Sequence, residues 1–105
     1  MTKPTLLTAS QIEAQLRSLP GWKSQNKSIS RQYSDFPGYL EALEFVYRLG
    51  QAAEKADHHP DITMNYKKVT VTFSTHSAGG VTDLDLKGAA TAEEIAGQFI
   101  KTSIA

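Results

Sequence analysis

The chain has 105 residues, no cysteine, and eleven basic residues that balance eleven acidic ones. The lack of cysteine excludes disulfide bonds, thiolate catalysis and cysteine zinc sites, and the balanced charge gives no sign of a nucleic-acid or anionic-membrane partner. No apolar run approaches the ~20 residues of a membrane-spanning helix, and Met1–Thr5 lacks the features of a signal peptide. We therefore expect one cytoplasmic domain over residues 1–105, with a core small enough to make an oligomer plausible.

The first third of the chain predicts a short helix followed by a β-hairpin. Thr8 and Gln11 have the spacing of a capping box, and the apolar stripe behind them predicts a helix that Pro20-Gly21 stops. Alternation on both sides of a polar turn, from Trp22 to Tyr33, predicts two antiparallel strands. Arg31 interrupts the apolar face of the second strand, and an edge position in the sheet would tolerate it.

The longest helical pattern runs from residue 36 or 37 to about residue 58, with apolar side chains every three or four residues. Ser34 or Asp35 is available to cap its start. Pro60 disfavours helical backbone angles at the residue before it. We therefore expect the helix to stop at Asp57 or His58.

A second hairpin, over residues 62–66 and 69–74, alternates apolar and polar side chains, which predicts one face packed on helices and one polar face. His76 would continue the polar face. Thr82 and Asp85 resemble a capping box at the start of a last helix, which we expect from Asp83 to Lys101. A further capping box that begins at Thr91 would allow a break in this helix near residue 91.

The predicted order is α-β-β-α-β-β-α. That order indicates an α+β fold, in which a four-stranded antiparallel sheet has three helices packed on one face. We expect a functional site on the polar face of the sheet or at the surface of a partner subunit.

The three histidines are the residues best suited to chemistry. His58 and His59 adjoin at the predicted end of the long helix, and His76 follows the second hairpin. Imidazoles titrate near neutral pH, so one ring can donate a proton while another accepts one. The free carbonyls of the helix end favour the protonated form of His58. Glu54 and Asp57, one helical turn apart, are placed to orient a ring.

Three interpretations of this pattern stay open on spacing alone. The pair His58-His59 can simply end a helix in an exposed loop. The three histidines can bind zinc, although adjacent ligands without an i, i+4 pair are awkward. The third interpretation is acid–base chemistry or ligand binding, in which Asp85 either accepts a hydrogen bond from a ligand or only caps its helix.

A longer pattern surrounds these residues. Glu54–Asp61, which contains His58-His59-Pro60, is followed by Tyr66, by Ser74-Thr75-His76 and by Asp85. With this pattern the chain resembles the pterin-4a-carbinolamine dehydratase family. Segments 19–22, 29–33 and 36–43 are also similar to the family, so the resemblance covers nearly the whole chain. Gly88 and Thr91 depart from it, because larger apolar residues are usual there.

The resemblance implies the fold described above, homodimers often paired into tetramers, no metal or organic cofactor, and a functional link to an aromatic amino acid hydroxylase. The implied reaction dehydrates 4a-hydroxytetrahydropterin to quinonoid dihydropterin, which needs an acid for the leaving oxygen and a base for the N5 proton. The resemblance assigns catalysis to His58, His59 and His76. It assigns substrate binding to Glu54, Asp57, Pro60, Thr75, Ser77 and Asp85.

Our hypothesis within this family is that His58 and His76 share the acid–base work, while His59 positions the pterin. Some animal relatives also act as dimerisation cofactors of a transcription factor, so the alternative is a non-catalytic dimerisation or binding module of the same fold. We identify no apolar docking patch in the sequence to support it. A zinc hydrolase is the third hypothesis.

Overall fold

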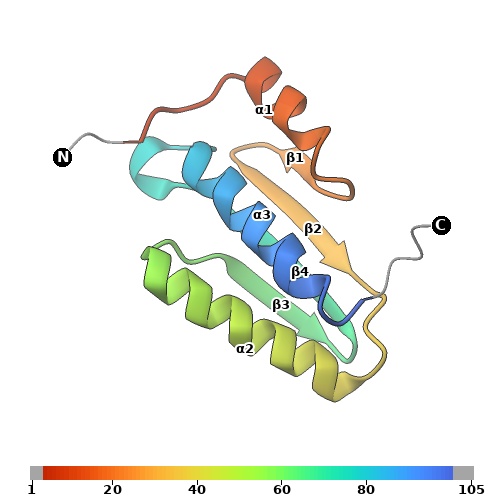
Figure 1. The fold of residues 1–105 in the computed structure, drawn as a ribbon. Helices are drawn as coiled ribbons and strands as arrows, with labels where there is room; N and C mark the ends of the chain where they lie inside the picture. The colour runs from red at the N-terminus through yellow and green to blue at the C-terminus, as the bar shows by residue number, and fades with distance from the viewer. Residues whose placement is uncertain (1–3, 101–105) are drawn as a thin grey trace.

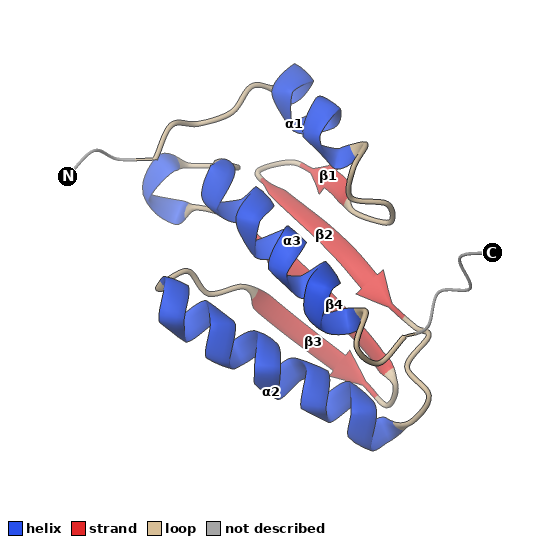
Figure 2. Cartoon of the chain, in the orientation of Figure 1, coloured by secondary structure: helices blue, strands red, loops and turns tan. Residues whose placement is uncertain are grey.

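The computed structural model describes residues 4–100, and its ribbon shows helices covering one face of a twisted sheet (Figure 1). The helices are α1 (Ala9–Leu16), α2 (Tyr39–Ala56) and α3 (Asp83–Ala96), and a short 3₁₀ turn, η1, spans His76–Ala78. The strands are β1 (Lys23–Gln25), β2 (Ser28–Tyr33), β3 (Asp61–Asn65) and β4 (Lys68–Phe73) (Figure 2). The predicted α+β architecture and its element order are confirmed.

The four strands form one antiparallel sheet in the order β1-β2-β4-β3. Ile29 pairs with Phe73, and Tyr33 pairs with Val69, so their side chains meet on the face that the helices cover. All four are buried. The other face is polar, as the alternation predicts. α3 runs along the middle of the covered face, between α2 and α1 (Figure 1).

The second strand does not take the edge position that would tolerate Arg31, because β2 lies between β1 and β4. β1 nevertheless pairs only with residues 28–30, so from Arg31 onward β2 has no strand on its β1 side and pairs with β4 alone. The Arg31 side chain donates to both carboxylate oxygens of Glu93 on α3, at 2.8 Å each. A charge on the apolar face is tolerated there because it is paired.

The helix starts follow the sequence where a capping box is present. Thr8 caps α1 and Thr82 caps α3, each in a reciprocal capping box as predicted. Neither Ser34 nor Asp35 caps α2. The residue before α2 is Gly38, which makes no side-chain cap, because the preceding segment must first bury Phe36 against other core rings.

The predicted helix ends are less accurate. α1 ends at Leu16, before Pro20-Gly21, and residues 17–21 continue as turns. α3 passes Thr91 without a break and ends at Ala96, whereas the predicted end, Lys101, lies outside the described residues. Within residues 4–100, no helix is long and apolar enough to cross a membrane.

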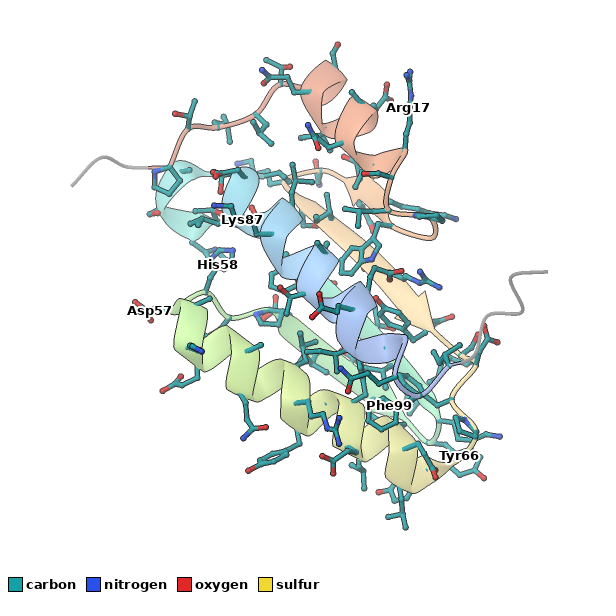
Figure 3. All side chains as sticks on the ribbon, in the orientation of Figure 1. Arg17, Asp57, His58, Tyr66, Lys87 and Phe99 are labelled. Atoms are coloured by element: carbon teal, nitrogen blue, oxygen red, sulfur yellow. The ribbon has the colours of Figure 1, made fainter. Side chains whose placement is uncertain are left out.

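The end of α2 decides where His58 goes. Asp57 takes a left-handed conformation with φ 53°, and two hydrogen bonds close the helix, Asp57 N–H to Glu54 O at 3.2 Å and His58 N–H to Ala53 O at 3.1 Å. These are the two bonds of a Schellman motif. The predicted stop near Asp57 is confirmed, but this motif makes it, ahead of Pro60. It turns the chain so that the His58 side chain points toward α3 (Figure 3).

Candidate functional site

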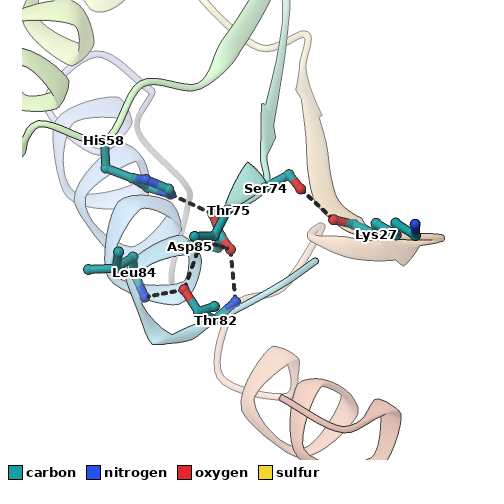
Figure 4. Close-up of polar contacts among 7 residues, drawn as sticks. All are labelled: Lys27, His58, Ser74, Thr75, Thr82, Leu84 and Asp85. Atoms are coloured by element: carbon teal, nitrogen blue, oxygen red, sulfur yellow. Dashed lines mark hydrogen bonds and ion pairs between the residues drawn. The ribbon is translucent and has the colours of Figure 1, made fainter. Parts of the chain in front are cut away.

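The candidate site lies at the N-terminal end of α3, where the chain leaving α2 and the segment after β4 come together (Figure 4). His58 stacks on the ring of Phe73, with centroids 5.9 Å apart and an interplanar angle of 15°. Phe73 is buried on the face of the sheet that the helices cover. His58 therefore enters the layer between sheet and helices and does not lie on the polar face of the sheet.

Asp85 is the centre of this site and is 0% exposed. Its Oδ1 atom lies 2.6 Å from Nε2 of His58. Its Oδ2 atom accepts hydrogen bonds from the Thr75 hydroxyl at 2.8 Å and from the Thr82 backbone N–H at 2.9 Å. A buried carboxylate is costly unless such partners satisfy it, and no buried side-chain polar atom in the described part of the chain is left unsatisfied.

Counting protons fixes the direction of each bond. Thr75 has a single hydroxyl proton, which it donates to Asp85, so in its 2.8 Å contact with Thr82 it must accept. The Thr82 hydroxyl in turn accepts from the backbone N–H of Leu84 at 3.2 Å. Backbone and hydroxyl donors therefore form a chain from the start of α3 to Asp85 (Figure 4). Chains of this kind strengthen each bond through mutual polarisation.

These bonds also bear on the tautomer of the His58 ring. With Asp85 as a carboxylate that accepts at both oxygens, His58 is the donor and its Nε2 carries the shared proton. Nδ1 is left as the nitrogen that can exchange a proton. The His58 side chain is 13% exposed, so it is held on one side and still reaches solvent. A histidine oriented by a carboxylate is a usual arrangement for general acid–base catalysis.

His59 lies in a different setting, because its side chain is exposed to solvent. Its Nε2 atom is 2.8 Å from Oε1 of Glu54, and the two side chains are 56% and 81% exposed. As a carboxylate only accepts, His59 donates from Nε2–H and also keeps Nδ1 free. The predicted pairing of a histidine with Glu54 is present, but solvent screens it and it fixes the ring weakly.

His76 begins η1, so it does not lie on the face of β4, which ends three residues earlier. Its side chain is exposed, as are Ser77 and Asp57. His76 directly follows Thr75, and His59 directly follows His58. His58 therefore bonds to Asp85 directly, and His59 and His76 each follow in sequence a residue that bonds to Asp85.

Two residues of the site were missed as functional residues by the sequence analysis. Thr82 was expected only as a helix cap, although the capping-box spacing already implies its bond to Asp85. Phe73 was expected only as core, and nothing in its pattern indicates that it stacks on His58. Within residues 4–100, no three His, Asp or Glu side chains are grouped so that they could hold a metal ion.

A second carboxylate, Glu93, gathers donors farther along α3. It accepts from Trp22 Nε1 at 3.0 Å, from Arg31 at 2.8 Å and from the Tyr33 hydroxyl. Burial raises the pKa of Tyr33 far above its usual range, and the hydrogen bond and charge of Glu93 add to the rise. This cluster holds α3 on β2.

The matches to known proteins span both the Asp85 site and the Glu93 cluster. Residues 5–95 match the family model described as pterin 4 alpha carbinolamine dehydratase. A Picosynechococcus protein that carries this name provisionally is 44% identical over 87% of this chain and 98% of its own. A Mycobacteroides abscessus protein with the same provisional name is 45% identical over 82% of this chain and 90% of its own.

Solved structures agree with these sequence matches. The crystal structure of a transcriptional coactivator/pterin dehydratase from Brucella melitensis has a TM-score of 0.83 at 40% identity, over 87% of this chain and 98% of that one. A pterin dehydratase-like RuBisCO assembly factor of the alpha-carboxysome has a TM-score of 0.60 at 19% identity, over 72% of this chain and 87% of its own, which shows the shared fold alone. Since family model, relatives and fold all coincide over the segment that carries His58 and Asp85, the chain belongs to the pterin 4 alpha carbinolamine dehydratase family.

Proposed function

We propose that the protein dehydrates 4a-hydroxytetrahydropterin to quinonoid dihydropterin and water. The observation that carries this proposal is the 2.6 Å contact between His58 and the fully buried Asp85. In the reaction, an acid protonates the 4a-oxygen, the C4a–O bond breaks with its electron pair going to water, and a base removes the N5 proton as the N5=C4a bond forms. Both proton transfers suit imidazoles near neutral pH.

His58 supplies one of the two proton-transfer groups. Asp85 holds its Nε2–H, so the ring keeps one tautomer and one orientation, and Nδ1 exchanges the proton with the substrate. His76 is the second group in this proposal, because it is exposed and directly follows Thr75. His59, held loosely by Glu54, positions the pterin.

The proposed substrate-binding residues divide into two groups by burial. The side chains of Thr75 and Asp85 are buried and fully engaged with each other, so they act through His58 as positioning residues. Asp57, Ser77 and Glu54 are exposed, and Pro60 is half-buried. These four are accessible to a substrate at the mouth of the site.

The test is a dehydration assay with carbinolamine generated by an aromatic amino acid hydroxylase, scored above the spontaneous rate. We expect His58→Ala and His76→Ala each to lower kcat by about 10²-fold or more. His59→Ala should mainly raise KM, because it removes binding rather than chemistry. Wild-type rates in all three variants would refute the assignment.

A surface on α2 supports a second proposal, that the protein forms homo-oligomers or serves as a binding module. Leu40 is 73% exposed and Tyr47 is 62% exposed, and Leu43 between them is also exposed. Their spacing of three and four residues places them on one helix face. The sequence analysis identified no apolar docking patch, and these exposed side chains are the observation that supports this proposal.

We propose a second copy of this chain as the occupant of that face, since a chain of this length has a small core of its own. Sedimentation of Leu40→Ser/Tyr47→Ser should show a smaller species than the wild type, and histidine variants should leave the assembly unchanged. An unchanged assembly in the double variant would count against this surface.

A further inference from the structure

A small apolar cavity lies between α2 and α3, with the ring of Phe73 as one wall and His58 at its edge. Its volume is about 100 Å³. Its α2 side includes Ala53 and Ala56, and its α3 side includes Gly88 and Thr91. His58 and Leu84 line the cavity as well, whereas Asp85, Thr75 and Thr82 do not.

The cavity exists because small residues face each other across the two helices, and it stays open because its wall is held in place. A Cβ atom added at Gly88 would lie 2.5 Å from Cε1 of Phe73. The Phe73 ring is also packed against Trp22, with centroids 6.1 Å apart, and stacked on His58. With contacts on several sides, the ring cannot simply tilt inward to fill the space.

The size and chemistry of the cavity restrict what it can hold. It is smaller than the ~150 Å³ apolar cavity that holds benzene or xenon, and far below the ~300–1,000 Å³ of sites for drug-sized ligands. A complete pterin is therefore too large and too polar for it. A lining that is mostly apolar favours an uncharged group over water or an ion.

We propose that this cavity is a binding site for a small uncharged apolar group, branched aliphatic or at most a single ring, whose occupant contacts the ring of His58. Such a group can be a free small molecule or a substituent of the substrate. Binding in the cavity does not depend on the reaction proposed above. Only the second source, a substituent on the pterin, rests on that proposed function.

The first experiment measures binding of xenon and of benzene to the full chain, by NMR of the alanine methyl groups and of the His58 ring. We expect saturable shifts at Ala53, Ala56 and His58. Thr91→Leu places a larger side chain into the cavity and should weaken binding by at least about tenfold. The matched control is Ala90→Leu, the same new side chain at the exposed neighbouring position, which should bind as the wild type does.

Ala56→Leu provides a second filling variant, because this exposed last residue of α2 tolerates a larger side chain without loss of the fold. It should reproduce the effect of Thr91→Leu. The proposal is overturned if neither xenon nor benzene gives saturable shifts at the cavity, or if both filling variants bind as tightly as the wild type.

The second experiment separates the two sources by comparing carbinolamines with 6-methyl, 6-propyl and 6-hydroxymethyl groups. If a substituent of the substrate fills the cavity, kcat/KM is highest for the 6-propyl carbinolamine. Xenon then competes with that substrate, and Thr91→Leu removes the preference for the 6-propyl group. If a free molecule fills it, the three substrates react alike while xenon and benzene still bind. Binding of xenon without any dehydration would leave the cavity proposal intact and refute the proposed reaction.

Discussion

Helix α3 carries two carboxylates that each gather several hydrogen-bond donors, and the two clusters differ in what their donors can do. Asp85 is bound by His58, Thr75 and the Thr82 backbone. Glu93 is bound by an arginine, a phenol and an indole. Only the Asp85 cluster contains an imidazole, the side-chain type suited to acid–base chemistry. The two clusters therefore have a similar number of hydrogen bonds and differ in the chemical type of their donors.

Phe73 connects the two clusters physically. Its ring packs against Trp22, which donates to Glu93, and stacks on His58, which donates to Asp85. The two clusters can therefore be disturbed separately at their carboxylates or together through this ring.

Asp85→Asn should have the largest effect on activity. The amide oxygen is needed where Oδ2 accepts from Thr75 and Thr82, so the amide N–H₂ faces His58 and converts Nε2 into an acceptor. The ring proton then moves to Nδ1, the nitrogen proposed to exchange protons, and kcat should fall by about 10²–10⁴-fold. The dehydration assay measures kcat, and ¹⁵N shifts of the His58 ring report the tautomer.

The matched control for this change is Asp83→Asn at an exposed position of the same helical turn, which should leave both measurements unchanged. A variant Asp85→Asn with wild-type kcat and an unchanged His58 tautomer would contradict the role given to this carboxylate.

Glu93→Gln should show the opposite profile, with lower stability and nearly unchanged kcat. It leaves the half-buried Arg31 without its charge partner, and we expect the free energy of unfolding to fall by about 2 kcal/mol. Urea denaturation measures this, with Glu94→Gln at the exposed neighbouring position as control. A kcat loss as large as that of Asp85→Asn would mean that the clusters are not separate in function.

Gly88→Ala should affect both clusters through Phe73. The new methyl group would overlap the ring, which should cost about 1–3 kcal/mol and also displace His58. Gly50→Ala in α2 has no heavy atom within 4 Å of the new Cβ and should stabilise by about 0.5–1 kcal/mol. Adding Phe73→Leu to Gly88→Ala should recover part of the lost free energy of unfolding. If the effects of the two changes were additive, the proposed overlap between residue 88 and the Phe73 ring would be contradicted.

Tyr33→Phe should have a small effect, a fall of about 0.5–1.5 kcal/mol in the free energy of unfolding at neutral pH, because the hydroxyl that donates to Glu93 is lost, and this difference should shrink in alkali. The pKa of Tyr33 is raised in the folded state, so its stabilising contribution is complete below the unfolded pKa of about 10 and is lost as pH rises beyond that value. The wild type should lose about 1.4 kcal/mol per pH unit there for each such proton. Unfolding between about pH 9 and 11 should show a shallower slope in Tyr33→Phe than in Tyr39→Phe, an exposed control.

The sequence alone determined the features that depend on neighbours within a few residues. The capping boxes at Thr8 and Thr82 and the end of the long helix near Asp57 are confirmed, as is the alternation of the strands. The family pattern also placed His58 and Asp85 in one site. Such local features follow from spacing because the interacting groups are held close by the chain itself.

Only the tertiary structure decided which distant groups meet. His58 and Asp85 are 27 residues apart, and Arg31 and Glu93 are 62 apart. Their contacts, the apolar face of α2 and the cavity beside Phe73 depend on how helices pack on the sheet. Packing is set by the combined shape of many side chains, and no short stretch of sequence contains that information.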